Sequence, residues 1–130
     1  MSKTQKDLIE FRLSRADESL NMARLALENS FFNSAVSELY YTCFYLITAL
    51  FAQQDIHTST HKAVKSLFNL HFVKEGKVEE RWGALLKEVF NKRQQGDYGD
   101  YILMEASDAR RLLQEVQQFR NIILQQLQTF

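Results

Sequence analysis

Proline is absent from the sequence, and glycine occurs only four times in 130 residues. These two residue types most often interrupt or end helices, so few positions along the chain can break one. The sequence also shows no strand-like alternation, internal repeat, low-complexity tract or linker. Since 130 residues is an ordinary length for one domain, we expect residues 1–130 to form a single helical domain.

Signals for export or membrane insertion are also missing. The N-terminus, MSKTQKDLIE, lacks the apolar core of a signal peptide. The longest nearly apolar run, Leu39 to Ala52, is too short to span a bilayer and predicts a buried core helix instead. The single cysteine, Cys43, cannot form an internal disulfide and lies within that run, which fits a reducing compartment. We therefore expect a soluble cytoplasmic protein without a membrane anchor.

The chain has no excess of either charge, because 16 Lys and Arg residues balance 16 Asp and Glu residues. A protein that coats nucleic acid is usually basic, since counterion release supplies most of that affinity. General attraction to RNA is therefore not predicted, whereas a local basic patch stays open. The sequence has no glycine-rich phosphate loop, no nucleophile elbow and no His, Cys and Glu cluster at metal-ligand spacing. We predict neither a cofactor nor a metal site.

Apolar residues at helical spacing run through the whole sequence. They predict a long first helix, a second over 34–54, a third from a Thr60 N-cap to about Phe72, a fourth over about 78–95 and a long last helix. Asn33 or Ser34 is the expected N-cap of the second helix, and Gly76 the end of the third. The first and last helices, with Arg120 in the last one's apolar seam, are predicted to pack along each other. The fold class is all-α, an up-and-down bundle of about five helices.

The predicted second helix is apolar nearly all round, which places it in the middle of the bundle. Glu38, Tyr41, Tyr45 and Thr48 are exceptions that follow three-and-four spacing and therefore share one face. Two interpretations stay open. Either the tyrosines line a cleft and stack on bases, or they lie in the core or at a dimer interface with their hydroxyls bonded. We favour the second interpretation.

The nonapeptide RQQGDYGDY, which starts at Arg93, concentrates polar and turn residues between the last two helices. Arg93, Asp97, Tyr98 and Asp100 are candidates for a binding site, because a guanidinium grips phosphate through its planar fork. The alternative is ordinary helix-end chemistry. In that interpretation Gly96 takes a positive-φ position after the fourth helix, Asp97 or Asp100 caps the next helix, and Arg93 pairs with Asp97.

Several segments in order give the chain a recognisable pattern. They are SRADESLNMARLALENSFFNSAVSELYYTCFYLITALF, with its Tyr40-Tyr41 pair, then THKAV, then HFVKEG, and finally Arg93 followed by Asp97-Tyr98. This order and spacing resemble the HEPN family, small helical domains often encoded beside minimal nucleotidyltransferases in prokaryotes. The resemblance covers nearly the whole chain.

The resemblance implies a helical bundle that commonly forms homodimers. In the catalytic branches of the family, an Arg and a His with four to six residues between them cleave RNA without metal, and the paired sites face each other across the dimer. Counted from Arg93, that histidine would replace Tyr98, Gly99 or Asp100, so it is absent here. A tyrosine, with a reference pKa of about 10, is a poor base at neutral pH, whereas an imidazole titrates there. Phosphate binding by Arg93 survives this loss better than catalysis does.

Another side chain could take the place of the missing histidine. His61, beside Lys62 in THKAV, opens a predicted helix, where the helix dipole favours anions. Tyr98 is the other candidate acid–base. An isolated histidine is more often a surface or capping group, and a tyrosine is a poor base at neutral pH. Neither residue is therefore assigned a catalytic role.

Three functions are left open by these observations. The one we favour is a homodimeric HEPN-like protein that binds a nucleotide, RNA or a nucleotidyltransferase partner in a two-gene toxin–antitoxin-type module. Its predicted binding residues are Arg93, Asp97, Tyr98, Glu38, Tyr41 and Tyr45. The second function is a metal-independent endoribonuclease toxin that uses Arg93 with His61 or Tyr98, and the absent histidine argues against it. The third is a helical adaptor without a ligand.

Overall fold

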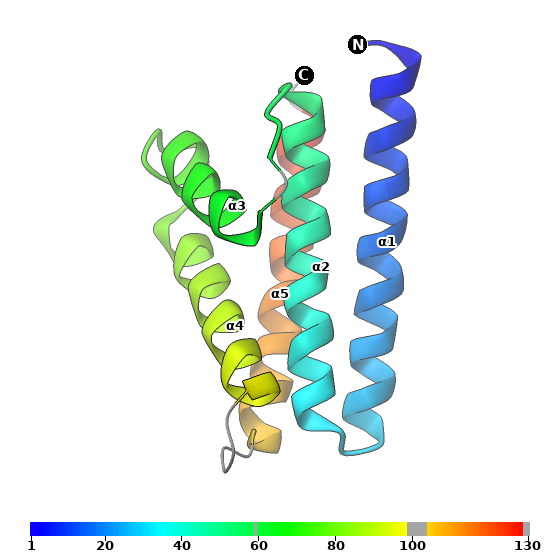
Figure 1. Cartoon of the computed structure of the whole chain (residues 1–130), viewed down its shortest axis with the longest axis vertical. Coiled ribbons are helices and arrows are strands. Elements are labelled where there is room, and N and C mark those ends of the chain that lie inside the picture. Colours follow the sequence, from blue (N-terminus) through cyan, green and yellow to red (C-terminus); the bar gives the residue numbers. More distant parts are fainter. Residues whose placement is uncertain (59, 99–103, 129–130) are drawn as a thin grey trace.

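The computed structural model describes residues 1–58, 60–98 and 104–128. Within these ranges the chain forms five α-helices: α1 (Lys3–Glu28), α2 (Phe32–Gln53), α3 (His61–Phe68), α4 (Glu80–Tyr98) and α5 (Ala106–Gln128). One turn of π-helix, Asn69–Val73, continues α3. The four long helices run alternately down and up in chain order, and the short α3 lies to one side of α2 (Figure 1). The predicted all-α, up-and-down bundle is confirmed.

Helix α2 lies at the centre of the bundle and contacts α1, α3, α4 and α5. Its apolar side chains are buried on nearly every side, and Leu39, Leu46 and Leu50 have no exposed surface. By length and composition alone α2 could cross a membrane, but 72% of that stretch is buried by the rest of the protein. This is the burial of a core helix, as the sequence predicted.

The prediction that α1 and α5 pack along each other is confirmed, although this is not the main contact of either helix. Each of them packs chiefly on α2, and α1 touches α5 over a smaller area. The physical reason is that α2 is apolar on all sides, so it takes the apolar stripes of both neighbours. Arg120 on α5 does reach α1, where its Nε donates to Asp17 Oδ1 at 2.8 Å. This bond raises the pKa of Arg120.

Two of the predicted boundaries of the third helix are confirmed. The Thr60 hydroxyl accepts a hydrogen bond from the backbone N–H of Ala63 at 3.1 Å, which fixes the first turn of α3. Gly76, with φ of +73°, follows the end of the helical segment. The predicted N-cap of α2 is wrong, because the helix already begins at Phe32. Asn33 Oδ1 instead accepts from the backbone N–H of Met104 at 3.3 Å.

The helix-end interpretation of Gly96 and Asp97 is also wrong. Helix α4 continues to Tyr98, so Gly96 is not a C′ residue and Asp97 cannot cap the next helix. A glycine inside a helix costs about 1 kcal/mol, and tertiary packing commonly overrides that cost. Here Gly96 lies against Asn33 at the start of α2. The last turn of α4 is therefore part of the packed bundle.

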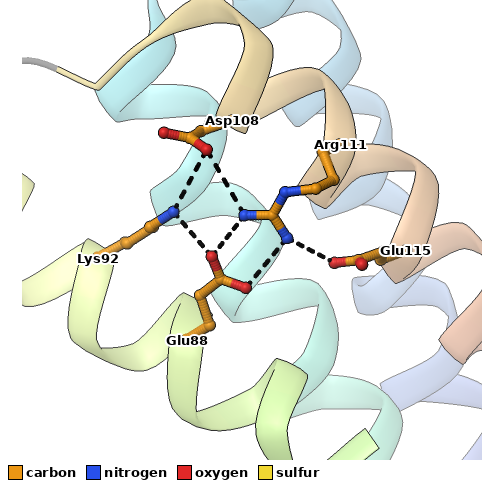
Figure 2. Close-up of polar contacts among 5 residues, drawn as sticks. All are labelled: Glu88, Lys92, Asp108, Arg111 and Glu115. Atoms are coloured by element: carbon orange, nitrogen blue, oxygen red, sulfur yellow. Dashed lines mark hydrogen bonds and ion pairs between the residues drawn. The ribbon is translucent and has the colours of Figure 1, made fainter. Parts of the chain in front are cut away.

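Five charged residues link α4 to α5: Glu88 and Lys92 from α4 and Asp108, Arg111 and Glu115 from α5 (Figure 2). Arg111 holds Glu88 through two bonds, Nη1 to Oε1 at 3.1 Å and Nη2 to Oε2 at 2.5 Å. Lys92 Nζ lies 2.8 Å from the same carboxylate. Mainly because of Arg111, the pKa of Glu88 is lowered to about 2. The pair therefore stays charged over most of the pH range.

We expect Glu88→Gln to lower the free energy of unfolding by about 1 kcal/mol at neutral pH, since partial exposure screens the pair. The lowered pKa means that the contribution is complete above the ordinary value of 4.5 and fades as pH falls towards 2. Urea unfolding of both proteins across that range measures the difference. Glu79→Gln, which removes an exposed contact with Arg81, is the matched control. Equal stability of wild type and Glu88→Gln at neutral pH would contradict this account.

Candidate functional site

A cluster of aromatic and cationic side chains forms where α4 packs on α2. The Arg93 guanidinium carbon lies 5.0 Å from the ring centre of Tyr40 and 5.1 Å from that of Tyr41. Arg93 Nη2 also donates to the Tyr41 hydroxyl at 3.0 Å. Guanidinium groups are attracted to aromatic faces, and the hydrogen bond adds direction. Two rings and a hydroxyl thus fix the position of this half-buried cation.

The first residue of α3 joins the same group. His61 stacks on Tyr40 and on Phe44, with ring centres 5.4 and 4.4 Å apart. Its Nδ1 also shares a hydrogen bond with the Tyr40 hydroxyl. The Thr60 cap fixes where α3 begins, and so it positions His61 against α2. The predicted candidate His61 therefore lies beside Arg93, although 32 positions (93 − 61) separate them in the sequence.

Burial and charge set the protonation of this group. Burial raises the pKa of the Tyr40 hydroxyl to about 12, against the opposing effect of Arg93. Burial, and then the Arg93 charge, lower the pKa of His61. At neutral pH the Tyr40 hydroxyl is therefore protonated and the His61 imidazole is neutral, and a hydrogen bond joins the two. Arg93 supplies the positive charge, and His61 places a neutral imidazole beside it.

Phe90 and Lys65 complete the group. The Phe90 ring meets Tyr40 edge to face at 5.7 Å, one helical turn before Arg93. Lys65 on α3 places its Nζ 4.8 Å from the Phe90 ring centre. We name Tyr40, Tyr41, Phe44, His61, Phe90 and Arg93, with Lys65 at the edge, the Arg93 cluster. It carries two cations, held on aromatic rings.

The predicted polar face of α2 is divided between two neighbours. Tyr41 joins the Arg93 cluster, but the Tyr45 hydroxyl accepts from Arg15 Nη2 of α1 at 3.1 Å. The hydrogen bond that Arg15 donates to Tyr45 is the main cause of the raised pKa of Arg15, and the charge of Glu38 contributes less. Tyr45 and Glu38 are therefore associated with α1, and sequence spacing alone did not separate them from Tyr41.

The structure does not describe the side chains of three other predicted site residues, Asp97, Tyr98 and Asp100. Asp97 and Tyr98 belong to the last turn of α4, and Asp100 lies outside the described residues. Their roles, and the pairing of Arg93 with Asp97, stay predictions.

A hollow of about 820 Å³ lies elsewhere, between the start of α1 and the end of α2. Arg12, which lines it, donates to the backbone carbonyl of Thr48 at 2.7 Å. Burial lowers the pKa of Arg12. This guanidinium thus binds the α2 backbone, and we centre the candidate site on the Arg93 cluster.

Comparison with known proteins decides the family. The HEPN domain family matches residues 9–127. The chain belongs to the HEPN family. It is 34% identical to a UPF0332 protein of Thermotoga maritima, over 95% of this chain and 92% of that protein. Two proteins of Methanocaldococcus jannaschii, each named a "putative toxin", are 31% and 28% identical, over 75% and 93% of this chain and 73% and 82% of theirs.

In this HEPN protein an imidazole lies beside the Arg93 cation, but it comes from α3 and not from the residues after Arg93. Sequence reasoning did not include Tyr40, Phe44 or Phe90 in the site. A usable signal was present: Tyr40 and Phe44 are one turn apart on α2, and Phe90 precedes Arg93 by one turn on α4. No spacing rule predicts that α3 places His61 between these two helices.

Protonating His61 is less favourable in the folded than in the unfolded protein, because burial and Arg93 lower its pKa. Its effect on stability is therefore absent above the unfolded pKa of about 6.5 and destabilising as pH falls below it. We expect His61→Gln to remove this part of the pH dependence, and His57→Gln, on the exposed connector, to retain it. Urea unfolding between about pH 8 and 5 measures both. Identical pH profiles for wild type and His61→Gln would contradict the prediction.

Proposed function

We propose that this HEPN protein binds the phosphate groups of RNA or of a nucleotide at the Arg93 cluster. We further propose that it acts as a cytoplasmic homodimer in a two-gene toxin–antitoxin-type module. The observation that carries the binding proposal is the fixed position of Arg93 on Tyr40 and Tyr41, beside His61. A preorganised cation binds an anion with less loss of side-chain entropy than a mobile one.

The chemistry of the cluster favours phosphate over a base as the primary contact. A guanidinium is planar, and its N–H groups match the spacing of phosphate oxygens. Tyr40 is only 2% exposed, so its ring supports the guanidinium and is not available for stacking on a base. Tyr41 and Phe44 are half-buried and are the rings a base could reach. Because the chain has no net charge, we expect the affinity to come from the few cations of the Arg93 cluster. The affinity should therefore fall only slowly as the salt concentration rises.

The module proposal has separate support. Two relatives are named "putative toxin", and the HEPN family resemblance implies a neighbouring minimal nucleotidyltransferase gene. The adjacent reading frame is therefore expected to encode a small nucleotidyltransferase that co-purifies with this chain. A neighbouring gene of another class, with no co-purification of any nucleotidyltransferase, would contradict the module proposal and leave the binding proposal intact.

Arg93→Ala is expected to weaken binding of a labelled single-stranded RNA, or of ATP, by roughly tenfold or more, the size of a lost charge-assisted hydrogen bond. Arg93→Lys keeps the charge but loses the planar fork, so an intermediate affinity is expected. Fluorescence anisotropy with each ligand measures both variants, after circular dichroism has established that they are folded.

Arg110→Ala is the matched control for charge, because Arg110 is exposed on α5. Its affinity should stay within about twofold of wild type, as expected for an exposed charge outside the site. Equal affinities of wild type and Arg93→Ala would remove Arg93 from the site. If the wild type bound neither ligand, the binding proposal would be wrong, and a helical adaptor without a ligand would be the better interpretation.

A second candidate function is metal-independent RNA cleavage, favoured by the position of His61 beside Arg93. Cleavage through the 2′-hydroxyl needs a base with an accessible lone pair near neutral pH. The Tyr40 hydroxyl occupies Nδ1 of His61, so a base at this position would have to act through Nε2 alone. The histidine that the family's catalytic branches carry after Arg93 is absent, so we favour binding over base catalysis.

We predict that the purified protein does not cleave a mixed RNA pool in EDTA. Gel electrophoresis of the pool before and after incubation is the measurement, and His61→Ala and Arg93→Ala exclude a contaminating nuclease. If the wild type cleaved the RNA and both variants did not, the protein would be a metal-independent endoribonuclease and the binding proposal would be wrong.

A further inference from the structure

A second arginine is held on a tyrosine of α2 in nearly the same way as Arg93. The Arg93 guanidinium carbon lies 5.1 Å from the ring centre of Tyr41, and its Nη2 donates to the Tyr41 hydroxyl at 3.0 Å. The Arg15 guanidinium carbon lies 5.2 Å from the ring centre of Tyr45, and its Nη2 donates to the Tyr45 hydroxyl at 3.1 Å. The same unit, a cation held by a ring and its hydroxyl, therefore occurs twice.

The two tyrosines stand on successive turns of one face of α2. Tyr41 and Tyr45 are four residues apart, so they share a face and lie about 6 Å apart along the helix axis. Arg93 reaches this face from α4, and Arg15 reaches it from α1, which lies on the other side of α2 (Figure 1). A spacing of this order separates neighbouring phosphates in a nucleic-acid strand. Two helices far apart in the sequence therefore bring cations to one face at a distance that a single strand can bridge.

Half-buried aromatic rings connect the two cations. Phe44 meets Tyr45 edge to face, with 5.8 Å between ring centres, and it stacks on His61 at 4.4 Å. His61 in turn lies 6.3 Å from Tyr41. All four residues keep part of their surface exposed. The line of ring contacts is therefore unbroken from one tyrosine to the other, and bases of a single strand can stack along it.

Arg15 is exposed and has N–H groups to offer a ligand. A guanidinium has five N–H groups, and the Tyr45 hydroxyl accepts from one of them. Glu18 and Glu38 act on Arg15 through their charge, but no carboxylate in the described part of the chain forms an ion pair with it. The tyrosine therefore orients this cation, and no carboxylate holds it in a direct pair.

We propose that Arg15, held on Tyr45, is a second phosphate subsite that continues the Arg93 cluster along α2. A single-stranded RNA crosses the face with one phosphate at Arg93 and a neighbouring phosphate at Arg15, and its bases lie on the rings between them. The preferred ligand is then a strand with several phosphates, and not a nucleoside monophosphate, whose one phosphate contacts one cation. This inference rests on the proposed binding of phosphate at the Arg93 cluster and narrows the class of ligand.

Arg15→Ala is expected to weaken binding of a single-stranded RNA of roughly eight nucleotides by about fivefold to tenfold, the effect of one lost charge-assisted contact. The salt dependence shows whether that contact is to phosphate. For a single strand, each phosphate contact steepens the fall of log affinity with log salt by about 0.7, so Arg15→Ala and Arg93→Ala should each reduce the slope by that amount. Fluorescence anisotropy at several salt concentrations measures affinity and slope together.

Two further variants separate charge from structure. Arg15→Lys keeps the positive charge, so it should keep the wild-type salt slope with an intermediate affinity. Arg110→Ala, which removes an exposed charge on α5, should change neither quantity. An exposed contact between a cation and a ring contributes only about 0.5–1 kcal/mol, so the Arg15 variants should stay folded, and circular dichroism checks this. A wild-type salt slope in Arg15→Ala would overturn the second subsite.

Competition with a nucleoside monophosphate tests the class of ligand. Unlabelled AMP should need at least about a tenfold higher concentration than unlabelled RNA to displace the labelled strand, and equal potency of the two would overturn this inference. The proposed function and the second subsite fail in different ways. Weaker RNA binding by Arg93→Ala, with wild-type binding by Arg15→Ala, would overturn the second subsite alone. A wild-type protein that binds no RNA would overturn both.

Discussion

Two adjacent tyrosines on the central helix impose a constraint on the helices around them. Tyr40 is buried to 2% exposure, and a buried hydroxyl without a hydrogen-bond partner costs roughly 1–3 kcal/mol. The partners come from other elements, His61 at the start of α3 for Tyr40 and Arg93 near the end of α4 for Tyr41. The same contacts that satisfy α2 therefore assemble a cation and an imidazole in one place. In this HEPN protein the candidate site is a consequence of how the core is completed.

The fold could be predicted largely from periodicity and from helix-breaking residues. The buried stripe of α1, the burial of α2 and the Thr60 cap all follow from local patterns that survive packing. The α1–α5 contact could be predicted but not its small extent, because several apolar stripes compete for one fully apolar helix and sequence patterns do not rank such pairings. The prediction that Gly96 follows the end of the fourth helix was wrong, because tertiary packing overrode the low helix propensity of glycine.

The site could be predicted only in part. Arg93 was found because it begins a polar nonapeptide between two helices, Tyr41 because of its spacing on α2, and His61 because it begins a helix, whereas Tyr40 was not assigned to the site. Their meeting depends on where α3 begins relative to α2 and on where α4 packs on α2, which no local pattern contains. Tyr45 shows the converse. It shares a face with Tyr41 in the sequence, yet it contacts Arg15 of α1 because α2 lies between two different neighbours.

The central claim is that Arg93 and His61 form one electrostatic unit on the tyrosine pair. Its most direct test is an NMR titration of the His61 imidazole in wild type and in Arg93→Ala, with assignment by His61→Gln. Burial, and after it the Arg93 charge, lower the pKa of His61, so the pKa is predicted to rise part of the way towards its ordinary value when that charge is removed. Superimposable His61 titration curves in two folded proteins would show that the side chains do not interact, and the account of the site would be wrong.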